Sequence, residues 1–218
     1  MTALVSAVYG GYDTPKPLPP DHGFDDAVLV TDVYVDTPGW RVVVAPSPGP
    51  TRLAAKAPKM RPWDFTDDGT SLWLDGSFEV LPGGGLRDAV DRHLADGDLV
   101  AWRHPLRVDA YEEAGFSGTY VKYAGIADDL QAQVDAYREA GFPPGTGLWE
   151  CGMLARRHSD AVRAHGQAWL DQVHRYTVQD QVSFPFVCWS RGIDPVPWRG
   201  DSHWDCGWVR WWPHMDQQ

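Results

Sequence analysis

The sequence predicts an α/β fold in which helices flank one mixed central sheet. Apolar, β-prone runs recur along the chain, helical patterns lie between several of them, and two of the runs end in aspartate. The β-prone runs occupy residues 3–9, 26–32, 40–44, 71–75, 98–102 and 148–155. Helical periodicity is clearest over residues 126–140, and further helices are expected over 86–94 and from 159 to about 176.

The first strand, 3–9, runs into the segment Tyr9-Gly10-Gly11-Tyr12-Asp13. A glycine-rich turn after the first strand of an α/β fold is typical of a nucleotide site, because glycine lets the backbone approach a ligand. Tyr12 would be placed to stack on a base. The turn is not GxGxxG, so no dinucleotide fold is predicted. A plain Gly-Gly loop is the alternative.

The run at 71–75 ends in Asp75, followed by Gly76 and Ser77. A carboxylate at the carboxyl end of a strand in an open α/β sheet lies where ligands bind. Asp75 would then hold a divalent metal ion, and that ion would hold a diphosphate. The alternative is an ordinary β-turn containing Asp-Gly.

Basic residues of the first half suggest contacts to an anionic ligand. Arg52 and Lys56 are four positions apart, so they share one face if the segment is helical. Two cations near a strand-end carboxylate would suit a diphosphate, whereas a solvated helix face is the alternative. His104, which follows the strand 98–102, is a further candidate donor, or simply a partner for a loop carbonyl.

The second half of the chain offers two carboxylates and an aromatic tail. Asp180 begins an expected helix and Glu150 lies in the β-prone run 148–155. A helix N-terminal acid is the alternative for Asp180. The segment from Trp198 to Met215 contains five Trp and two His, and we expect it to fold over the site.

Composition excludes some classes of function. The net charge of −11 disfavours a broad nucleic-acid footprint. Twelve Trp residues suggest stacking on sugars or bases. Three widely spaced cysteines form neither a disulfide framework nor a zinc motif. The N-terminus lacks signal-peptide features and no apolar run is long enough to span a membrane, so we expect a cytoplasmic protein of bacterial or phage type.

Eight short segments resemble, in order and spacing, a small GT-A-like glycosyltransferase domain of bacteria and plants. This family was formerly a domain of unknown function, and its plant members are linked to mucilage polysaccharide synthesis and to alkaline ceramidase activity. The matching segments are Val8–Asp13, Arg52–Lys56, Trp73–Ser77, His104–Arg107, Tyr111–Ala114, Gly141–Pro143, Ala155–His158 and Gln179–Phe184. The family has an arginine where Gln179 stands, and Ser77 replaces the second acid of Asp-x-Asp.

The resemblance implies a single GT-A-like, Rossmann-type domain over residues 1–190, with 191–218 as a Trp-rich extension packing over the active site. It implies transfer of a hexosyl or pentosyl group from a nucleoside diphosphate sugar, with Asp75 as the metal-linked acid and Asp180 in the acceptor pocket. The expected donor-binding residues are Tyr9, Gly10, Tyr12, Arg52, Lys56, Asp75, Gly76, Ser77, His104 and Arg156.

For the chemistry we expect Mn²⁺ or Mg²⁺ held by Asp75, Ser77 and a tail histidine, His203 in preference to His214. An inverting enzyme would use Asp180 or Glu150 as base, whereas a retaining one would need Asp180 only for orientation. The acceptor would be a glycan, a small molecule or a hydroxymethylated DNA base, the last disfavoured by charge. The alternatives are a ceramide-type hydrolase and a non-catalytic carbohydrate-binding module.

Overall fold

A computed structural model describes residues 1–47, 49–200 and 206–214 of the chain. Its sheet has seven strands in the order β3-β2-β1-β4-β7-β6-β8, and β5 pairs with β9 beside it. The strands are β1 (Thr2–Val8), β2 (Asp26–Thr31), β3 (Arg41–Val44), β4 (Thr70–Leu74), β5 (Phe78–Val80), β6 (Leu99–Arg103), β7 (Trp149–Arg157), β8 (Val196–Pro197) and β9 (Val209–Trp211). The sheet is mixed, as predicted: β3, β2, β1 and β4 are parallel, and β7 is antiparallel to β4 and β6.

The strand directions bring several chain segments to one edge of the sheet. The carboxyl ends of β1, β2 and β4 meet there because these strands are parallel. β7 runs the other way and pairs Met153 with Leu74 at the end of β4, so its first residues lie at the same edge. A site at this edge therefore draws on both halves of the sequence.

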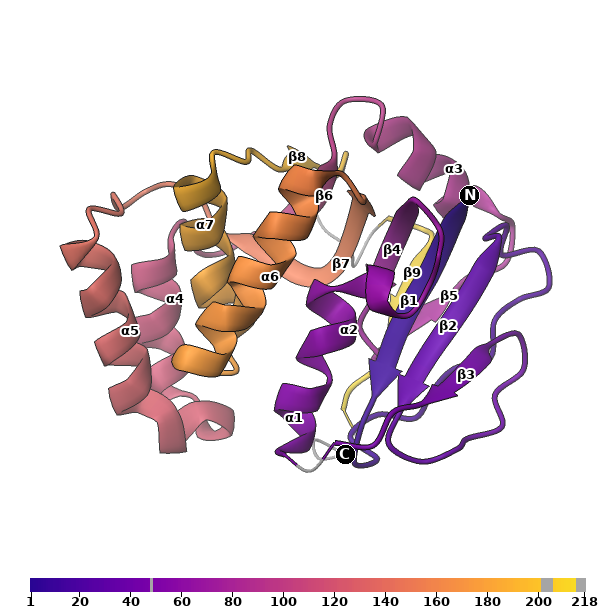
Figure 1. Cartoon of the computed structure of the whole chain (residues 1–218), viewed down its shortest axis with the longest axis horizontal. Helices are drawn as coiled ribbons and strands as arrows, with labels where there is room; N and C mark the ends of the chain where they lie inside the picture. Colours follow the sequence, from indigo (N-terminus) through magenta and orange to yellow (C-terminus); the bar gives the residue numbers. More distant parts are fainter. Residues whose placement is uncertain (48, 201–205, 215–218) are drawn as a thin grey trace.

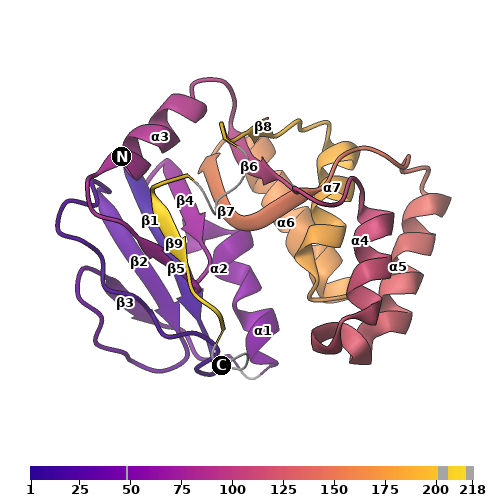
Figure 2. The ribbon, with the colours of Figure 1, turned by 180° about the vertical axis from the view of Figure 1, so that it is seen from behind.

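Helices cover the sheet and form a group beside it (Figure 1). They are α1 (Thr51–Ala54), α2 (Lys56–Met60), α3 (Gly85–His93), α4 (Ala110–Thr119), α5 (Ala127–Glu139), α6 (Asp160–Arg175) and α7 (Asp180–Arg191), with short 3₁₀ turns η1 (Pro62–Asp64) and η2 (Val121–Ile126). α1, α2 and α6 lie on one face, whereas α3 and the β5–β9 pair lie on the other, as the view from behind shows (Figure 2).

Successive side chains of β1 point to opposite faces of the sheet, which explains why two cores form. Ala3 and Val5 pack into the core beneath α2 and α6, whereas Leu4 packs into the core beneath α3 and β9. Every residue of β1 is buried, as expected for a strand covered on both faces. A third, smaller core joins α4, α5 and α7, and it includes Tyr137 and Phe142.

Helix α4 was not predicted from the apolar pattern, although its start carries a clear signal. The Asp109 side chain accepts a hydrogen bond from the Glu112 backbone N–H at 2.8 Å, and the Glu112 carboxylate accepts one from the Val108 N–H at 2.9 Å. Asp109 is therefore the N-cap, and the Asp-x-x-Glu sequence forms a variant of the capping box in which Glu112 binds the N–H of Val108, the residue before the cap. No helix in the described part of the chain is long and apolar enough to cross a membrane.

The position of α2 depends on a very close contact with α6. A Cβ added to Gly166 of α6 would lie 2.1 Å from the Met60 carbonyl oxygen and 2.6 Å from the Trp63 ring. Only glycine therefore allows the end of α2 to approach α6 this closely. This contact matters for the site because α2 carries Lys56 and Lys59.

We predict that Gly166→Ala destabilises the fold by roughly 1–3 kcal/mol, because the added methyl group overlaps the backbone of α2. Gly115→Ala on α4 is the matched control: it adds the same methyl group where nothing lies within 4 Å, and it should stabilise the fold by up to about 1 kcal/mol. Urea denaturation measures both. Equal midpoints for Gly166→Ala and wild type would contradict the proposed close packing.

Candidate active site

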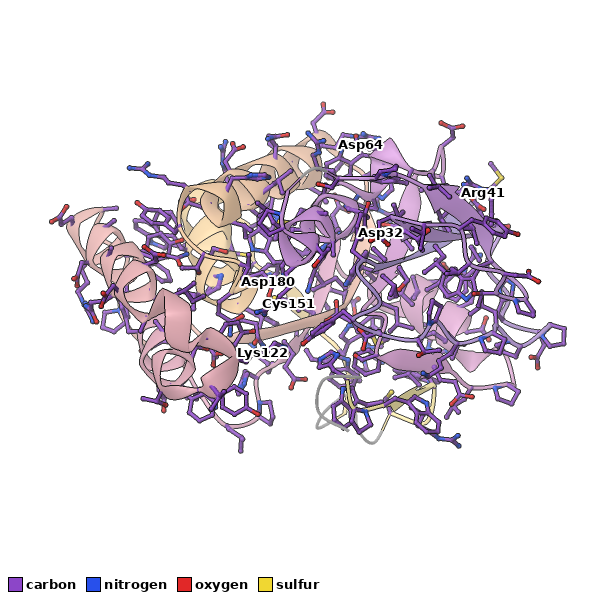
Figure 3. The ribbon with its side chains drawn as sticks, turned by 90° about the horizontal axis from the view of Figure 1, so that it is seen from below. Asp32, Arg41, Asp64, Lys122, Cys151 and Asp180 are labelled. Atoms are coloured by element: carbon purple, nitrogen blue, oxygen red, sulfur yellow. The ribbon has the colours of Figure 1, made fainter. Side chains whose placement is uncertain are left out.

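A cavity of about 500 Å³ lies at the carboxyl edge of β1 and β4. Segments far apart in the sequence line it: the turn after β1, α1 and α2, the end of β4, α4 with η2, the start of β7, the start of α7 and part of the tail. Seen from below, Lys122, Cys151 and Asp180 gather between the sheet and the helical group, and all three line this cavity (Figure 3).

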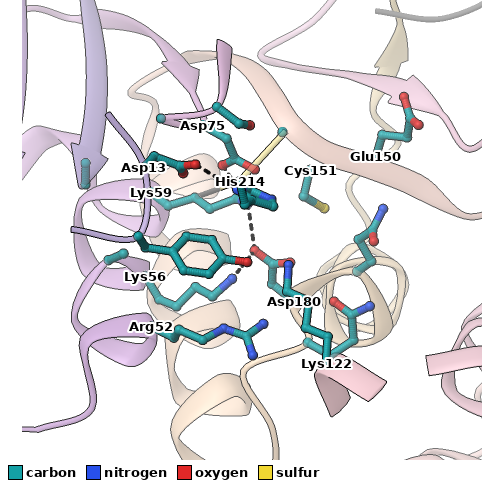
Figure 4. Close-up of a pocket in the computed structure, with 18 of the residues that line it drawn as sticks. Asp13, Arg52, Lys56, Lys59, Asp75, Lys122, Glu150, Cys151, Asp180 and His214 are labelled. Atoms are coloured by element: carbon teal, nitrogen blue, oxygen red, sulfur yellow. Dashed lines mark hydrogen bonds and ion pairs between the residues drawn. The ribbon is translucent and has the colours of Figure 1, made fainter. Parts of the chain in front are cut away.

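Four charged side chains form a continuous chain across the cavity floor. The Asp180 carboxylate accepts a hydrogen bond from Lys56 Nζ at 2.8 Å and forms an ion pair with Lys59 Nζ at 2.7 Å. Lys59 Nζ also donates to Asp75 Oδ1 at 3.2 Å. The order Lys56–Asp180–Lys59–Asp75 therefore alternates in sign, and it connects the start of α7 to the end of β4 (Figure 4).

Burial makes these interactions strong. The side chains of Asp180 and Lys59 are 7% and 5% exposed. Burial alone would raise the pKa of Asp180, but the two ammonium groups outweigh it and hold that pKa well below its usual range. Burial opposes the charge of Lys59, yet Asp180 and Asp75 raise its pKa above the usual value. Lys56 has less carboxylate support, so burial lowers its pKa.

Asp75 is held at the end of β4 by its neighbours. Its Oδ1 accepts a second hydrogen bond from Trp73 Nε1 at 2.6 Å, and Trp73 is buried in the sheet. A Cβ on Gly76 would lie 2.6 Å from a methyl group of Val8, so the chain after Asp75 passes directly against the end of β1. Asp75 and the turn after β1 are thereby brought to the same side of the cavity.

The glycine turn after β1 is fixed at its start by two hydrogen bonds. Gly10, at φ 63°, donates its N–H to Asp32 Oδ2 at 2.9 Å, and Asp32 directly follows β2. The Tyr9 hydroxyl donates to the Ala45 carbonyl at 2.9 Å. The Tyr12 ring lines the cavity and lies 4.6 Å from the His214 ring. Tyr12 therefore presents an aromatic ring beside the strand ends.

Part of the tail returns to this cavity. β9 pairs with β5, and Trp211 and His214 line the cavity. His214 Nδ1 lies 2.8 Å from Asp13 Oδ1. His203, the preferred metal ligand among the sequence expectations, lies outside the described residues, so His214 is the tail histidine that the structure places here. The domain boundary at residue 190 stays a prediction.

The opposite wall comes from α4, η2 and α7. Gln179 Nε2 donates to Glu113 Oε1 at 2.8 Å and to Ser117 Oγ at 2.9 Å. Glu113 also forms an ion pair with Arg107. These residues all line the cavity, and Gln179 immediately precedes Asp180. Gln179 is thus a neutral amide that binds a carboxylate already paired to Arg107.

Most predicted site residues line the cavity: Tyr9, Tyr12, Arg52, Lys56, Asp75, Gly76, Ser77, Glu150 and Asp180. Gly10, His104 and Arg156 are not among its lining residues. His104 Nδ1 accepts the backbone N–H groups of Leu106 and Arg107, and burial and Arg107 lower the pKa of its ring. It is a loop histidine whose hydrogen bonds are local.

Arg156 lies behind the cavity rather than in it. The antiparallel register pairs Arg156 with Ser71, three residues before the end of β4, so it lies well away from the ligand-binding edge. It is 2% exposed, and its guanidinium donates to the Lys59 carbonyl. Arg156 therefore supports the main chain of α2 instead of contacting a phosphate group directly.

Sequence reasoning missed several cavity residues: Asp13, Lys59, Glu113, Phe116, Ser117, Tyr120, Lys122 and Tyr123. Lys59 is three positions after Lys56, a helical spacing, but Pro58 between them disguised the helix. Glu113 and Ser117 follow the capping box of α4, which was the available signal for that wall. Asp13 ends the glycine-rich turn that was expected at the site, but its carboxylate was given no role.

A divalent cation, which the resemblance implies, can be tested against these residues. The described residues contain no cluster of three or more His, Cys, Asp or Glu side chains that would hold a metal alone. Asp75 nevertheless offers a carboxylate and Ser77 a hydroxyl at the cavity wall. Magnesium commonly takes one or two carboxylates and completes its shell with water and substrate phosphates. The residues fit a cation that arrives with a diphosphate.

Comparison with known proteins gives structural matches only. No protein-family model and no curated protein matches this sequence. Among solved structures, a galactosyltransferase, LgtC, in complex with donor and acceptor sugar analogues aligns over 84% of this chain and 70% of its own, at 13% identity and TM-score 0.46. Mouse xyloside xylosyltransferase 1 aligns over 87% and 82%, at 11% identity and TM-score 0.40.

The bifunctional glycosyltransferase WbbM aligns over 87% of this chain but 38% of its own length, at 11% identity and TM-score 0.47. All three proteins are glycosyltransferases by name. At these identities and scores the similarity carries no argument about activity, so the function is argued below from the residues of this chain.

We predict that Asp180→Asn lowers the free energy of unfolding at pH 7 by roughly 3–5 kcal/mol, because it leaves two buried lysines without their shared carboxylate. The folded pKa of Asp180 is depressed, so its stabilisation is complete above the unfolded value of about 4 and is lost as pH falls further. The difference between variant and wild type should therefore shrink below about pH 4.

Asp64→Asn is the control, since its partner Arg61 is 35% exposed and the loss should stay below about 1 kcal/mol. Urea unfolding at pH 7 and in acid measures both variants. An Asp180→Asn penalty as small as that of Asp64→Asn would show that the buried charges do not depend on each other.

Proposed function

We propose that this protein is a glycosyltransferase that moves a sugar from a nucleoside diphosphate sugar to an acceptor hydroxyl. The observation that carries the proposal is the charged chain Lys56–Asp180–Lys59–Asp75, buried at Asp180 and Lys59 and open at Asp75, which lines a cavity at the strand ends. It places a permanently ionised carboxylate beside cations, in a pocket large enough for a nucleotide and a sugar.

The donor would occupy the half of the cavity next to β1 and β4. Tyr12, in the turn after β1, lines this half and offers a ring for the base. Arg52 lines the same cavity, with its guanidinium over the Tyr123 ring at 5.0 Å, and would add a charge-assisted contact to phosphate. Asp75 and Ser77 would lie beside the diphosphate.

A divalent ion, Mn²⁺ or Mg²⁺, would be held by Asp75 and Ser77, with a tail histidine as a further ligand. When bound it would supply a Lewis acid that neutralises the charge of the departing diphosphate. The ammonium of Lys59, fixed between Asp75 and Asp180, adds a positive charge at the same place. The Lys59 ammonium and a bound metal ion would therefore both stabilise the negative charge of the departing diphosphate.

Asp180 would orient the transferred sugar and stabilise positive charge as it develops at the anomeric carbon. Two lysines keep it ionised, and a carboxylate with so low a pKa accepts a proton poorly, so it does not suit the role of base. Glu150, at the start of β7, lines the cavity and is 9% exposed. In an inverting reaction Glu150 would take the acceptor proton, whereas a retaining reaction would not require it.

The cavity does not favour the hydrolase alternative. Cys151 lines it, but burial raises the pKa of its thiol well above the usual value, so the thiolate nucleophile is disfavoured. Ser71 Oγ lies 2.8 Å from His158 Nε2, but both residues are buried and neither lines the cavity. Burial also lowers the pKa of His158 to about 4.

We predict that Mn²⁺ with a pyrimidine or guanine nucleoside diphosphate raises the melting temperature of the wild type, because bound ligand stabilises the folded state by mass action. Mn²⁺ alone should do so much less, since residues 1–47, 49–200 and 206–214 offer no cluster of three or more His, Cys, Asp or Glu side chains and so supply only part of a coordination shell. Asp75→Asn should lose the combined effect, whereas Asp64→Asn, a distant carboxylate control, should keep it. Equal increases in melting temperature in both variants would show that Asp75 is not part of the donor site.

We also predict that Asp180→Asn lowers the transfer rate roughly 10²–10³-fold, as expected for loss of an electrostatic contact in the transition state. Its acidic limb of rate against pH should match that of the wild type, because Asp180 stays ionised throughout. Assays would run at a temperature where the variant is folded. Disappearance of the acidic limb in Asp180→Asn would instead make Asp180 the base, contrary to the proposal.

A further inference from the structure

Two aromatic rings on the cavity wall formed by α4 and η2 are not part of the core between α4, α5 and α7. Phe116 and Tyr120 are each 48% exposed, although both line the cavity. Their rings are nearly parallel, with centroids 6.1 Å apart and planes 23° apart. Exposed aromatic rings that face a cavity indicate a surface held available for a ligand.

This aromatic pair is fixed in place. The guanidinium of Arg107 lies over the Phe116 ring at 4.1 Å, and Arg107 is itself paired with buried Glu113. Ser117, between the two aromatic positions on α4, donates its hydroxyl to Glu113 at 3.0 Å. The rings therefore stand on a hydrogen-bonded support, so a ligand would meet a surface that is already ordered.

The polar support continues towards the reacting centre. Glu113, Ser117 and Gln179 all line the cavity, and Gln179 is adjacent in the chain to Asp180. The proposed donor half lies on the other side of Asp180, at the ends of β1 and β4. A hydroxyl that attacks a sugar held over Asp180 would therefore approach from the wall of α4 and η2.

We propose that this wall is the acceptor subsite and that it takes a saccharide ring, stacked on Tyr120 and Phe116, with hydroxyl groups directed to the polar support; this rests on the proposed function. The face of an aromatic ring carries partial negative charge. One face of a pyranose presents C–H groups of partial positive charge, while its hydroxyls lie around the edge. Aromatic rings beside carboxylate, hydroxyl and amide groups match that pattern.

The competing occupant is an apolar chain or membrane surface. Leu106, Val108 and Val121 are also exposed, at 79%, 64% and 92%. None of these three lines the cavity, whereas Phe116, Tyr120 and the polar residues do. The lining of the cavity therefore favours the saccharide, and the apolar occupant becomes one outcome of the test.

The test measures binding of purified protein to an array of immobilised, defined oligosaccharides covering hexose, pentose and uronic acid residues. The wild type should bind at least one class of glycan, and Phe116→Ala and Tyr120→Ala should each weaken that binding roughly five- to tenfold. Both positions are half exposed, so folding should survive, and circular dichroism confirms it. Val121→Ala, beside Tyr120 but outside the cavity lining, is the matched control and should bind as wild type does.

A second measurement separates this inference from the proposed function. Wild-type thermal shift with nucleoside diphosphates and Mn²⁺ reports on the donor half alone. If the diphosphate binds but no glycan does, or if Tyr120→Ala binds glycans as tightly as Val121→Ala, the subsite is wrong while glycosyl transfer stands. Binding to phosphatidylcholine or phosphatidylglycerol vesicles that is lost in Tyr120→Ala, without glycan binding, would assign the wall to an apolar partner and overturn the proposal.

Discussion

The cavity depends on an alternating chain of two lysines and two carboxylates at the carboxyl edge of the sheet, in which Lys59 and Asp180 are buried, Lys56 is partly buried and the side chain of Asp75 is 38% exposed. Ionised groups are costly to bury singly, so the buried pair Lys59 and Asp180 requires its charged neighbours to be present and correctly placed. Asp180 comes from α7, Asp75 from the end of β4, and both lysines from α2. The charge balance therefore couples three elements, and supporting contacts such as the Arg156–Lys59 hydrogen bond help to keep α2 in place.

The sequence allowed the sheet and most helices to be predicted, because apolar runs and helical periodicity are local signals. Asp75 could be placed at a strand end for the same reason, whereas Asp180 was expected in the acceptor pocket only because of the family resemblance. Arg156 was misjudged because its position depends on the antiparallel register between β4 and β7, which no local pattern encodes. Lys59 was missed because the proline within α2 obscured the helix. The cavity wall formed by α4 was missed because the Asp-x-x-Glu signal at the start of that helix was not used.

The two halves of the cavity differ in chemistry, and that difference organises the functional account. The side at β1 and β4 combines a tyrosine and a strand-end carboxylate, which suit a nucleotide and its diphosphate. The side at α4 combines exposed aromatic rings with a buried polar network. Asp180 lies between them, ionised by its lysines, where a sugar passing from one side to the other would meet it (Figure 4).

The most direct measurement is a crystal structure with Mn²⁺ and an intact nucleoside diphosphate sugar, using a variant or analogue that does not turn over. We expect the diphosphate to lie against Asp75 and Ser77 and the anomeric carbon to lie next to Asp180. The side of the sugar that the acceptor approaches should face α4. A donor bound elsewhere, or one whose sugar lies remote from Asp180 while the four charges remain paired, would contradict it.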